Sequence, residues 1–274
     1  MRINTNVSSL TAQDAAQNTS KSITSSLEKL STGLRINKAS DDASGLAIAD
    51  KLRTQATSIN QGIANGNSAV TLLQIADKSM AEQSNILDTV KAKLIQANTA
   101  TTSTDGRKAI ASDIAKLMTQ FDNIAKSTNY NGTDLISASA ADLDFQVGED
   151  STKGKITLTA IDSSASAYSL GALSSITSLT MASAATLQGT VDSAINSLNT
   201  NRGSIGSTQN QVESAVRNLM TMSTNVKAAE SIIRDVDYAA ESANFNKQNI
   251  ISQAGSYAIS QANSVQQNVL RLLQ

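Results

Sequence analysis

The stretch VDSAINSLNTNRGSIGSTQNQVESAVRNLMTMSTNVKAAESII, residues 191–233, decides the fold. Its apolar residues recur in a heptad-like pattern: Val191, Ile195, Leu198, Ile205, Val212, Val216, Leu219, Val226 and Ile233. A sustained seven-residue period predicts a helix with a narrow apolar seam that faces another helix. The remaining seam positions hold Arg202, Gln209, Ser223 and Glu230, and polar seam residues weaken a seam while fixing its register. Uninterrupted, this helix would be roughly 65 Å long at about 1.5 Å per residue.

The same pattern extends in both directions along the chain. Its other apolar positions are Ile23, Leu27, Leu30 and Leu34; Val70, Leu73, Met80, Leu87 and Leu94, with Asp77, Ser84 and Lys91 at polar seam positions; Ile110, Ile114, Leu117, Phe121 and Ile124; and Ile251, Ala254, Ala258, Ala262, Val265, Val269 and Leu272. Residues 31–33 indicate a helix end and residues 40–42 an N-cap. Residues 99–106 and 129–132 are typical of turns. The pattern therefore predicts several long helices packed lengthwise.

The middle of the chain differs from both ends. Leu143, Phe145 and Val147 alternate with polar residues, and the alternation resumes at Ile156 and Leu158 after a Gly-flanked turn. Two such runs predict a β-hairpin. Residues 163–183 are rich in Ser, Ala and Thr without a clear period, which we interpret as the outermost surface. Gly62 and Gly66 lie within a helical pattern and indicate either a close helix contact or a local break.

We therefore predict a mainly α fold: a long antiparallel helical bundle or coiled coil with a small β-hairpin region and paired termini. The expected segments are residues 1–42, 43–135, 136–186, 187–233 and 234–274. This arrangement brings the first and last helices side by side.

Composition argues against an enzyme. The chain has no Cys and no His, so it lacks the commonest metal ligands and the commonest acid–base catalyst, and no cofactor or metal site is expected. Asp41 and Asp42 are interpreted as helix-capping residues, and Glu149 and Asp150 as a solvated turn. The net charge of -1 indicates no nucleic-acid partner. The sequence contains neither a membrane-spanning apolar run nor a secretory signal pattern, which taken alone predicts a cytoplasmic protein.

The C-terminal end carries more apolar residues than one partner helix can cover. Leu270 and Leu273 lie off the stripe formed by Val265, Val269 and Leu272. A wide exposed apolar stripe marks an interaction site. Contacts between copies that do not close into a ring generate filaments. We therefore expect the terminal helices to bury their surfaces in other copies of the chain.

Two motifs at opposite ends resemble those of bacterial flagellins. The N-terminal match comprises MRINTN at residues 1–6 and LSTGLRINKASDDASGLAIAD at residues 30–50. The C-terminal match comprises IRDVD at 233–237, ANFNK at 243–247, QAN at 261–263 and VLRLLQ at 269–274. The resemblance covers roughly the first 135 and last 90 residues. It implies a short flagellin with little or no outer variable domain.

The resemblance implies a structural subunit that polymerises into the flagellar filament used for swimming. Residues 1–42 and 234–274 would form an inner tube, residues 43–135 and 187–233 an outer tube, and residues 136–186 its surface. The implied packing residues between subunits are Ile23, Leu27, Leu30, Leu34, Ile251, Ala258, Ala262, Val265, Val269, Leu270, Leu272 and Leu273. The implied partners are the chain itself, a flagellin export chaperone, the type III export apparatus, the filament cap and the hook-junction proteins, without membrane insertion. Export replaces the cytoplasmic expectation with an extracellular location.

Two further expectations follow from the resemblance. The segment that an innate receptor recognises in some flagellins is altered here at Thr89, Lys91 and Lys93, which implies evasion of that receptor. The Ser/Thr-rich surface is expected to carry O-linked glycans, as in some relatives, at Ser163, Ser164, Ser166, Ser169, Ser174, Ser175, Ser178, Thr180 and Ser183. Two alternative functions share the helical pattern: a hook–filament junction protein and, from a different class, a chemoreceptor-like signalling coiled coil.

Overall fold

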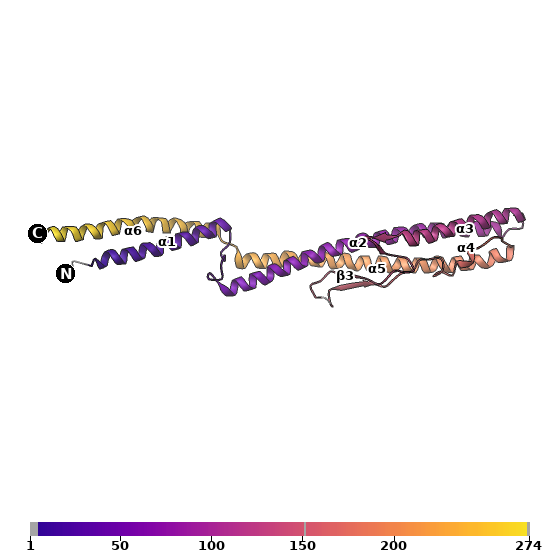
Figure 1. Cartoon of the computed structure of the whole chain (residues 1–274), viewed down its shortest axis with the longest axis horizontal. Helices are drawn as coiled ribbons and strands as arrows, with labels where there is room; N and C mark the ends of the chain where they lie inside the picture. The colour runs from indigo at the N-terminus through magenta and orange to yellow at the C-terminus, as the bar shows by residue number, and fades with distance from the viewer. Residues whose placement is uncertain (1–4, 151, 273–274) are drawn as a thin grey trace. The chain divides into compact units, whose positions relative to one another are not determined.

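The computed structural model describes residues 5–150 and 152–272, with side chains up to residue 268 (Figure 1). The described residues form, in order, α1 (Val7–Thr32), α2 (Ala43–Ala97), α3 (Thr104–Ser127), β1 (Asn129–Tyr130), β2 (Thr133–Asp134), β3 (Leu143–Gln146), β4 (Lys155–Leu158), α4 (Gly171–Ser174), α5 (Met181–Arg234) and α6 (Tyr238–Leu272). The expectation of a mainly α fold with a small β region is confirmed. The chain divides into two compact units, one within residues 1–56 and 224–274 and the other within 57–223.

In the second unit, α2 buries one residue at alternating intervals of three and four. These residues are Ile59, Gly62, Gly66, Ala69, Leu73, Ala76, Met80, Gln83, Leu87, Val90, Leu94 and Ala97. The seven-residue period is therefore correct, but the polar seam positions predicted at Asp77, Ser84 and Lys91 are wrong. Each of these three is half-buried, one residue beyond the seam. Ala76, Gln83 and Val90 occupy the seam instead, because alternate three- and four-residue steps lead to them from Leu73.

Helix α5 runs antiparallel to α2 within this unit. Three contacts occur in opposite order along the two helices: Asn60 with Ser223, Asp77 with Arg202, and Lys91 with Asp192. Six apolar residues of the predicted α5 stripe are buried, namely Val191, Leu198, Ile205, Val212, Val216 and Leu219. The Arg202 Nε to Asp77 Oδ1 distance is 2.9 Å, so two polar residues at the edge of the seam pair with each other.

Helix α3 folds back along α2 and buries Ile110, Ile114 and Phe121 of its predicted stripe. The turn between the two helices is shorter than residues 99–106, because α3 begins at Thr104. The Ser103 hydroxyl accepts a hydrogen bond from the Gly106 N–H and so caps the helix. Arg107 in the first turn of α3 also stabilises this turn, because its Nε donates to the carbonyl of Ala97, the last residue of α2, at 3.0 Å.

The predicted β-hairpin is formed by β3 and β4, which pair antiparallel with Phe145 opposite Ile156. It packs against α2 where that helix has glycines. A Cβ at Gly62 would collide with the Val147 carbonyl, and a Cβ at Gly66 would collide with the Val216 side chain. Of the two sequence interpretations of these glycines, close contact is confirmed, since α2 continues unbroken through both. A second, smaller hairpin joins β1 and β2.

The Ser/Thr-rich segment after β4 is not simply the outermost surface, and that prediction is wrong for its first half. Its apolar residues Ile161, Ala165, Tyr168, Leu170 and Leu173 are buried. The ring of Tyr168 meets Phe121 of α3 edge-on, with 6.2 Å between ring centroids. The segment therefore adds a covering layer to the helices. The mixture of small and apolar residues gave no regular period because this layer is mostly irregular.

In the first unit, α1 and α6 lie side by side (Figure 1). Asn6 directly precedes α1, and its side-chain amide donates to the Ala262 carbonyl at 3.1 Å. At the other end of the pair, the Val236 N–H donates to the Gly33 carbonyl at 3.0 Å. Gly33 ends α1 in the left-handed conformation with φ +75°, as the sequence predicted for a helix stop. The paired termini are confirmed within the described residues.

Candidate assembly surface

The side of α1 that meets α6 is lined by small and polar residues. Its buried or half-buried positions repeat at intervals of three and four: Ser9, Ala12, Ala16, Thr19, Ile23, Ser26 and Leu30. Only Thr19 and Ser26 of α1 are fully buried. Methyl and hydroxyl groups bury little apolar area, so the hydrophobic stabilisation on this side of α1 comes mainly from Ile23 and Leu30, which are only half-buried.

The matching side of α6 has the same character. The positions of α6 on the side of α1 are all half-buried, and they are Phe245, Ser252, Gly255, Ile259, Ala262 and Gln266. A Cβ at Gly255 would stand 4.0 Å from the Ala16 Cβ, an ordinary van der Waals distance. The two helices therefore approach closely at Ala16 and Gly255, and a few larger residues such as Phe245 and Ile259 are half-buried in the contact.

Those larger residues form a stripe on a different side of α6. Ile250 is 67% exposed, Ile251 42%, Tyr257 74% and Val265 53%. At 3.6 residues per turn these four lie within roughly one third of the helix circumference, together with the exposed Ala254 and Ala258. We call these six residues the α6 apolar stripe. An exposed apolar strip of this length indicates a surface that another protein chain covers.

The stripe shows where the predicted packing residues of α6 lie. Ile251, Ala258 and Val265 belong to the exposed stripe, whereas Ala262 is half-buried on the side facing α1. Ile251, Ala258 and Val265 are therefore free of α1, and their packing against other subunits stays a prediction. The side chains of Val269, Leu270 and Leu272 lie outside the described ones, and Leu273 lies outside the described residues.

The predicted packing residues of α1 are divided in the same way. Ile23 and Leu30 are half-buried toward α6, while Leu27 is 55% exposed. Leu34 is half-buried where the chain after α1 forms a β-bridge to Asp235. Val7 and Leu10, which the sequence interpretation did not include, are 65% and 51% exposed. Their signal was weak because they stand at the start of the helix, before the heptad pattern becomes regular.

A third side of α6 is polar and uncharged. Ser256, Ser260 and Ser264 are exposed there, and residues 248–270 contain no Asp, Glu, Lys or Arg. Helix α6 therefore has three distinct sides: a tight contact with α1, an apolar stripe and a neutral polar side.

Charged groups gather at the connector between α1 and α2. The Asp41 carboxylate accepts hydrogen bonds from the N–H groups of Lys38 and Asn37, which holds the pKa of Asp41 below its usual value. The hydrogen bond and charge of Glu28 raise the pKa of Lys38. Asp42 accepts a hydrogen bond from the Gly45 N–H at 2.9 Å. The capping role predicted for Asp42 is confirmed, whereas Asp41 binds backbone N–H groups of the connector and not those of α2.

The altered receptor segment lies on α2 in the second unit. Lys93 forms an ion pair with Asp113 of α3 at 3.0 Å, and Lys91 pairs with Asp192 of α5. Thr89 is exposed, and its hydroxyl donates to the Asn85 carbonyl. Both lysines are half-buried, so they connect neighbouring helices rather than extend freely into solvent.

The predicted glycan residues divide by exposure. The prediction of a glycan at Ser163 is wrong, because this side chain is fully buried and its hydroxyl donates to Oε1 of Gln83. Ser164 and Ser183 are half-buried. The exposed members are Ser166, Ser169, Ser174, Ser175, Ser178 and Thr180.

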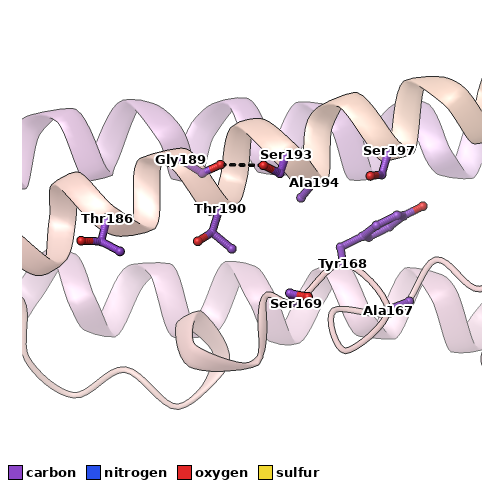
Figure 2. Close-up of a pocket in the computed structure, with 9 residues that line it drawn as sticks. All are labelled: Ala167, Tyr168, Ser169, Thr186, Gly189, Thr190, Ser193, Ala194 and Ser197. Atoms are coloured by element: carbon purple, nitrogen blue, oxygen red, sulfur yellow. Dashed lines mark hydrogen bonds between the residues drawn. The ribbon is translucent and has the colours of Figure 1, made fainter.

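An open pocket of about 480 Å³ lies between the Ser/Thr-rich segment after β4 and α5 (Figure 2). Its lining is almost entirely small or hydroxyl-bearing: Ala167, Tyr168, Ser169, Thr186, Gly189, Thr190, Ser193, Ala194 and Ser197. The Ser193 hydroxyl donates to the Gly189 carbonyl at 3.0 Å. The lining contains no Asp, Glu, Lys or Arg side chain. Across the described residues, no helix is long and apolar enough to cross a membrane.

Long paired helices whose large apolar residues remain exposed define a self-assembling structural protein. Comparison with known proteins identifies the family. The family model of the bacterial flagellin N-terminal helical region matches residues 3–141. The family model of the bacterial flagellin C-terminal helical region matches residues 188–273. The chain belongs to the bacterial flagellin family.

Individual relatives agree with this assignment. Flagellin of Bacillus subtilis is 35% identical over 305 residues, and the flagellar filament 33 kDa core protein of Treponema phagedenis is 32% identical over 287, each covering all of both chains. Flagellin B of Helicobacter pylori is 48% identical over 147 residues, which are 54% of this chain but only 29% of that protein. The crystal structure of Bacillus cereus flagellin superposes with a TM-score of 0.50 at 26% identity, covering 61% of this chain and 94% of that one.

Proposed function

We propose that this protein is a structural subunit that polymerises with itself into the bacterial flagellar filament and thereby serves swimming motility. The family assignment supports this function and not an enzymatic one. It also favours a filament subunit over a chemoreceptor-like coiled coil, and full-length relatives named flagellin favour it over a hook–filament junction protein. The observation that carries the proposal is the α6 apolar stripe, which α1 leaves uncovered.

The stripe gives polymerisation a physical driving force. Fully burying a Val or Ile side chain stabilises a contact by about 1.5–3 kcal/mol. A contact that repeats from copy to copy without closing into a ring builds a filament. We assign residues 1–42 and 234–274 to an inner tube and residues 43–135 and 187–233 to an outer tube, with 136–186 on its surface. Val269, Leu270, Leu272 and Leu273 would continue the apolar contact beyond Val265.

Matched substitutions on two sides of α6 test this assignment. Ile251→Asn and Val265→Asn place an amide on the stripe, while Ser256→Asn and Ser260→Asn place the same amide on the neutral polar side. Each stripe variant should lose about 2 kcal/mol per subunit contact, which raises the critical concentration for seeded polymerisation about thirtyfold. The serine variants should polymerise as the parent does. Parent-like polymerisation of both stripe variants, measured by sedimentation and electron microscopy, would rule out the stripe as the contact.

The assignment carries partners and a location with it. A subunit with exposed apolar helices needs a chaperone that covers α6 before export through the type III apparatus. It then needs a cap at the filament tip and hook-junction proteins at the base, and its final location is extracellular. Co-purification of an export chaperone with the intact chain, and its loss when residues 252–274 are deleted, tests the first of these steps.

We further propose that the changes at Thr89, Lys91 and Lys93 let the filament protein escape the innate receptor for flagellin. The ion pairs of Lys91 and Lys93 support this proposal, because they occupy side chains that a receptor would otherwise meet. Strong receptor activation by the purified monomer would overturn it. O-linked glycans remain proposed at the exposed hydroxyls from Ser166 to Thr180, and a single unmodified mass of the native protein would exclude them.

A further inference from the structure

The sequence contains two Asn-Gly pairs, Asn65-Gly66 and Asn131-Gly132. This dipeptide is chemically special because glycine has no Cβ to hinder its own backbone nitrogen. That nitrogen can attack the side-chain carbonyl carbon of the preceding asparagine when the chain bends far enough. The two pairs share this local chemistry, so any difference between them must come from the fold.

Asn131-Gly132 forms the tip of the β1–β2 hairpin. Both residues are in the left-handed region, with φ 51° and 80°, which fits the two-residue turn that favours Asn-Gly. Both are exposed, and no heavy atom lies within 4 Å of the place where a Gly132 Cβ would stand. Only two residue pairs close the hairpin, Asn129 with Asp134 and Tyr130 with Thr133. A hairpin this short opens locally at little cost in free energy.

Asn65-Gly66 has the opposite environment. It lies inside α2, where the backbone N–H groups are held in the helical hydrogen-bond ladder. The Asn65 amide donates to the Gln146 carbonyl at 3.0 Å, and its oxygen accepts from Gln61 at 2.9 Å. Gly66 is buried against Val216. Both the nucleophile and the amide are therefore immobilised.

We infer that Asn131 is a site of spontaneous deamidation and that Asn65 is protected from the same reaction. When the turn opens, a bond forms between the Gly132 nitrogen and Cγ of Asn131, and the bond from Cγ to Nδ2 breaks. The Gly132 amide proton leaves with the amide group as ammonia, and a cyclic succinimide remains. Water then adds to either ring carbonyl and opens the ring to aspartate or isoaspartate at position 131. No oxidant, metal or enzyme is required.

The product changes the hairpin in two ways. Either acid adds one negative charge at an exposed turn. Isoaspartate also routes the backbone through the former side chain and so inserts one methylene into a two-residue loop. The Leu135 N–H to Thr128 carbonyl bond lies directly beyond this hairpin. Ageing of the protein would therefore loosen the connection between the end of α3 and the chain that follows β2.

Incubation of the full-length protein in mildly alkaline buffer, followed by peptide mapping, tests the inference. Cleavage after Lys126 and Lys153 isolates the Asn131 peptide, and cleavage after Arg53 and Lys78 isolates the Asn65 peptide. The expected result is deamidation at Asn131 at least about tenfold faster than at Asn65 in the folded chain. In strong denaturant the two rates should become similar, since the local dipeptide is the same.

Two variants sharpen the result. Asn131→Gln lengthens the side chain and should suppress deamidation at position 131. Gln61→Ala removes one hydrogen bond of Asn65 and leaves the hairpin untouched, so the Asn131 rate should not change. Equal rates at the two sites in the folded protein, or a tenfold difference that persists in denaturant, would overturn the inference that the fold selects Asn131.

Discussion

Gly66 and Gly206 both lie inside long helices of the second unit, yet the space around them differs. A Cβ at Gly66 would overlap the Val216 side chain, whereas nothing lies within 4 Å of the corresponding point at Gly206. Gly66→Ala should lower the free energy of unfolding by about 1–3 kcal/mol because it overpacks the contact. Gly206→Ala should raise it by up to about 1 kcal/mol, since alanine is the better helix former. Urea denaturation measures both, and shifts of the same sign would contradict the packing argument.

Asp41 gives a residue-scale prediction for pH. The backbone N–H groups of Lys38 and Asn37 lower its pKa from the ordinary value of 3.8. A group with a depressed folded-state pKa stabilises the fold above its unfolded pKa, and this stabilisation disappears as the pH falls through the folded value. Asp41→Asn should therefore be less stable than the parent at neutral pH. The difference should shrink below about pH 4, as followed by thermal unfolding at several pH values.

The capping role of Asp42 was predictable because an acidic residue before a helix has a simple electrostatic and hydrogen-bonding purpose. The role of Ser163 was not. Its sequence neighbours Ser164 and Ser166 are partly or fully exposed, and nothing local distinguishes a serine that will meet Gln83, 80 residues away. Long-range partners of small polar residues are set by packing, which a single sequence does not display.

At the scale of elements, the Ser/Thr-rich segment after β4 is attached to the helices by the buried side-chain amide of Gln83 in α2. Nε2 of Gln83 donates to the carbonyls of Phe121 and Ser163, and its Oε1 accepts from the Ser163 hydroxyl. Ser163→Ala should cost about 1–3 kcal/mol, because it leaves a buried amide oxygen without its donor. Hydrogen exchange should increase through residues 161–170.

Ser166→Ala is the matched control for this attachment, since Ser166 is exposed in the same segment. It should leave the exchange pattern within error of the parent. Equal effects of the two substitutions would show that the buried amide does not hold the segment in place.

The helices themselves were predictable at the element scale, but the phase of α6 was not. Two stripes satisfy the same heptad spacing: the exposed one through Ile251 and Val265, and the one facing α1 through Ser252 and Gly255. Periodicity alone does not say which stripe meets a helix of the same chain and which meets another copy. In the structure the side with Ser252 and Gly255 faces α1, and the more apolar stripe stays exposed.

For the whole molecule, the two units should differ in their dependence on the C-terminal helix. The unit within 57–223 buries Leu73, Leu87, Phe121 and Leu198 among its own elements. Deleting residues 252–274 should therefore abolish filament formation and leave this unit folded. Circular dichroism and electron microscopy measure the two effects. Filaments from the truncated chain would contradict an assembly contact on α6.

The overall architecture could be predicted because its determinants are global: no proline, few aromatic residues and a seven-residue period along most of the chain. What could not be predicted is where the irregular covering layer packs. That layer depends on Tyr168 reaching Phe121 and on backbone carbonyls that carry no sequence signal.

The hydrogen bond between Asn6 and Ala262 joins residues separated by 256 positions. A ribosome delivers the chain in order, at about 5–20 residues per second. Helix α1 is therefore complete many seconds before any part of α6 exists. Throughout that interval Ile23 and Leu30, which are half-buried toward α6 in the full chain, lack that cover. A chain whose synthesis stops before Tyr238 therefore leaves that side of α1 uncovered.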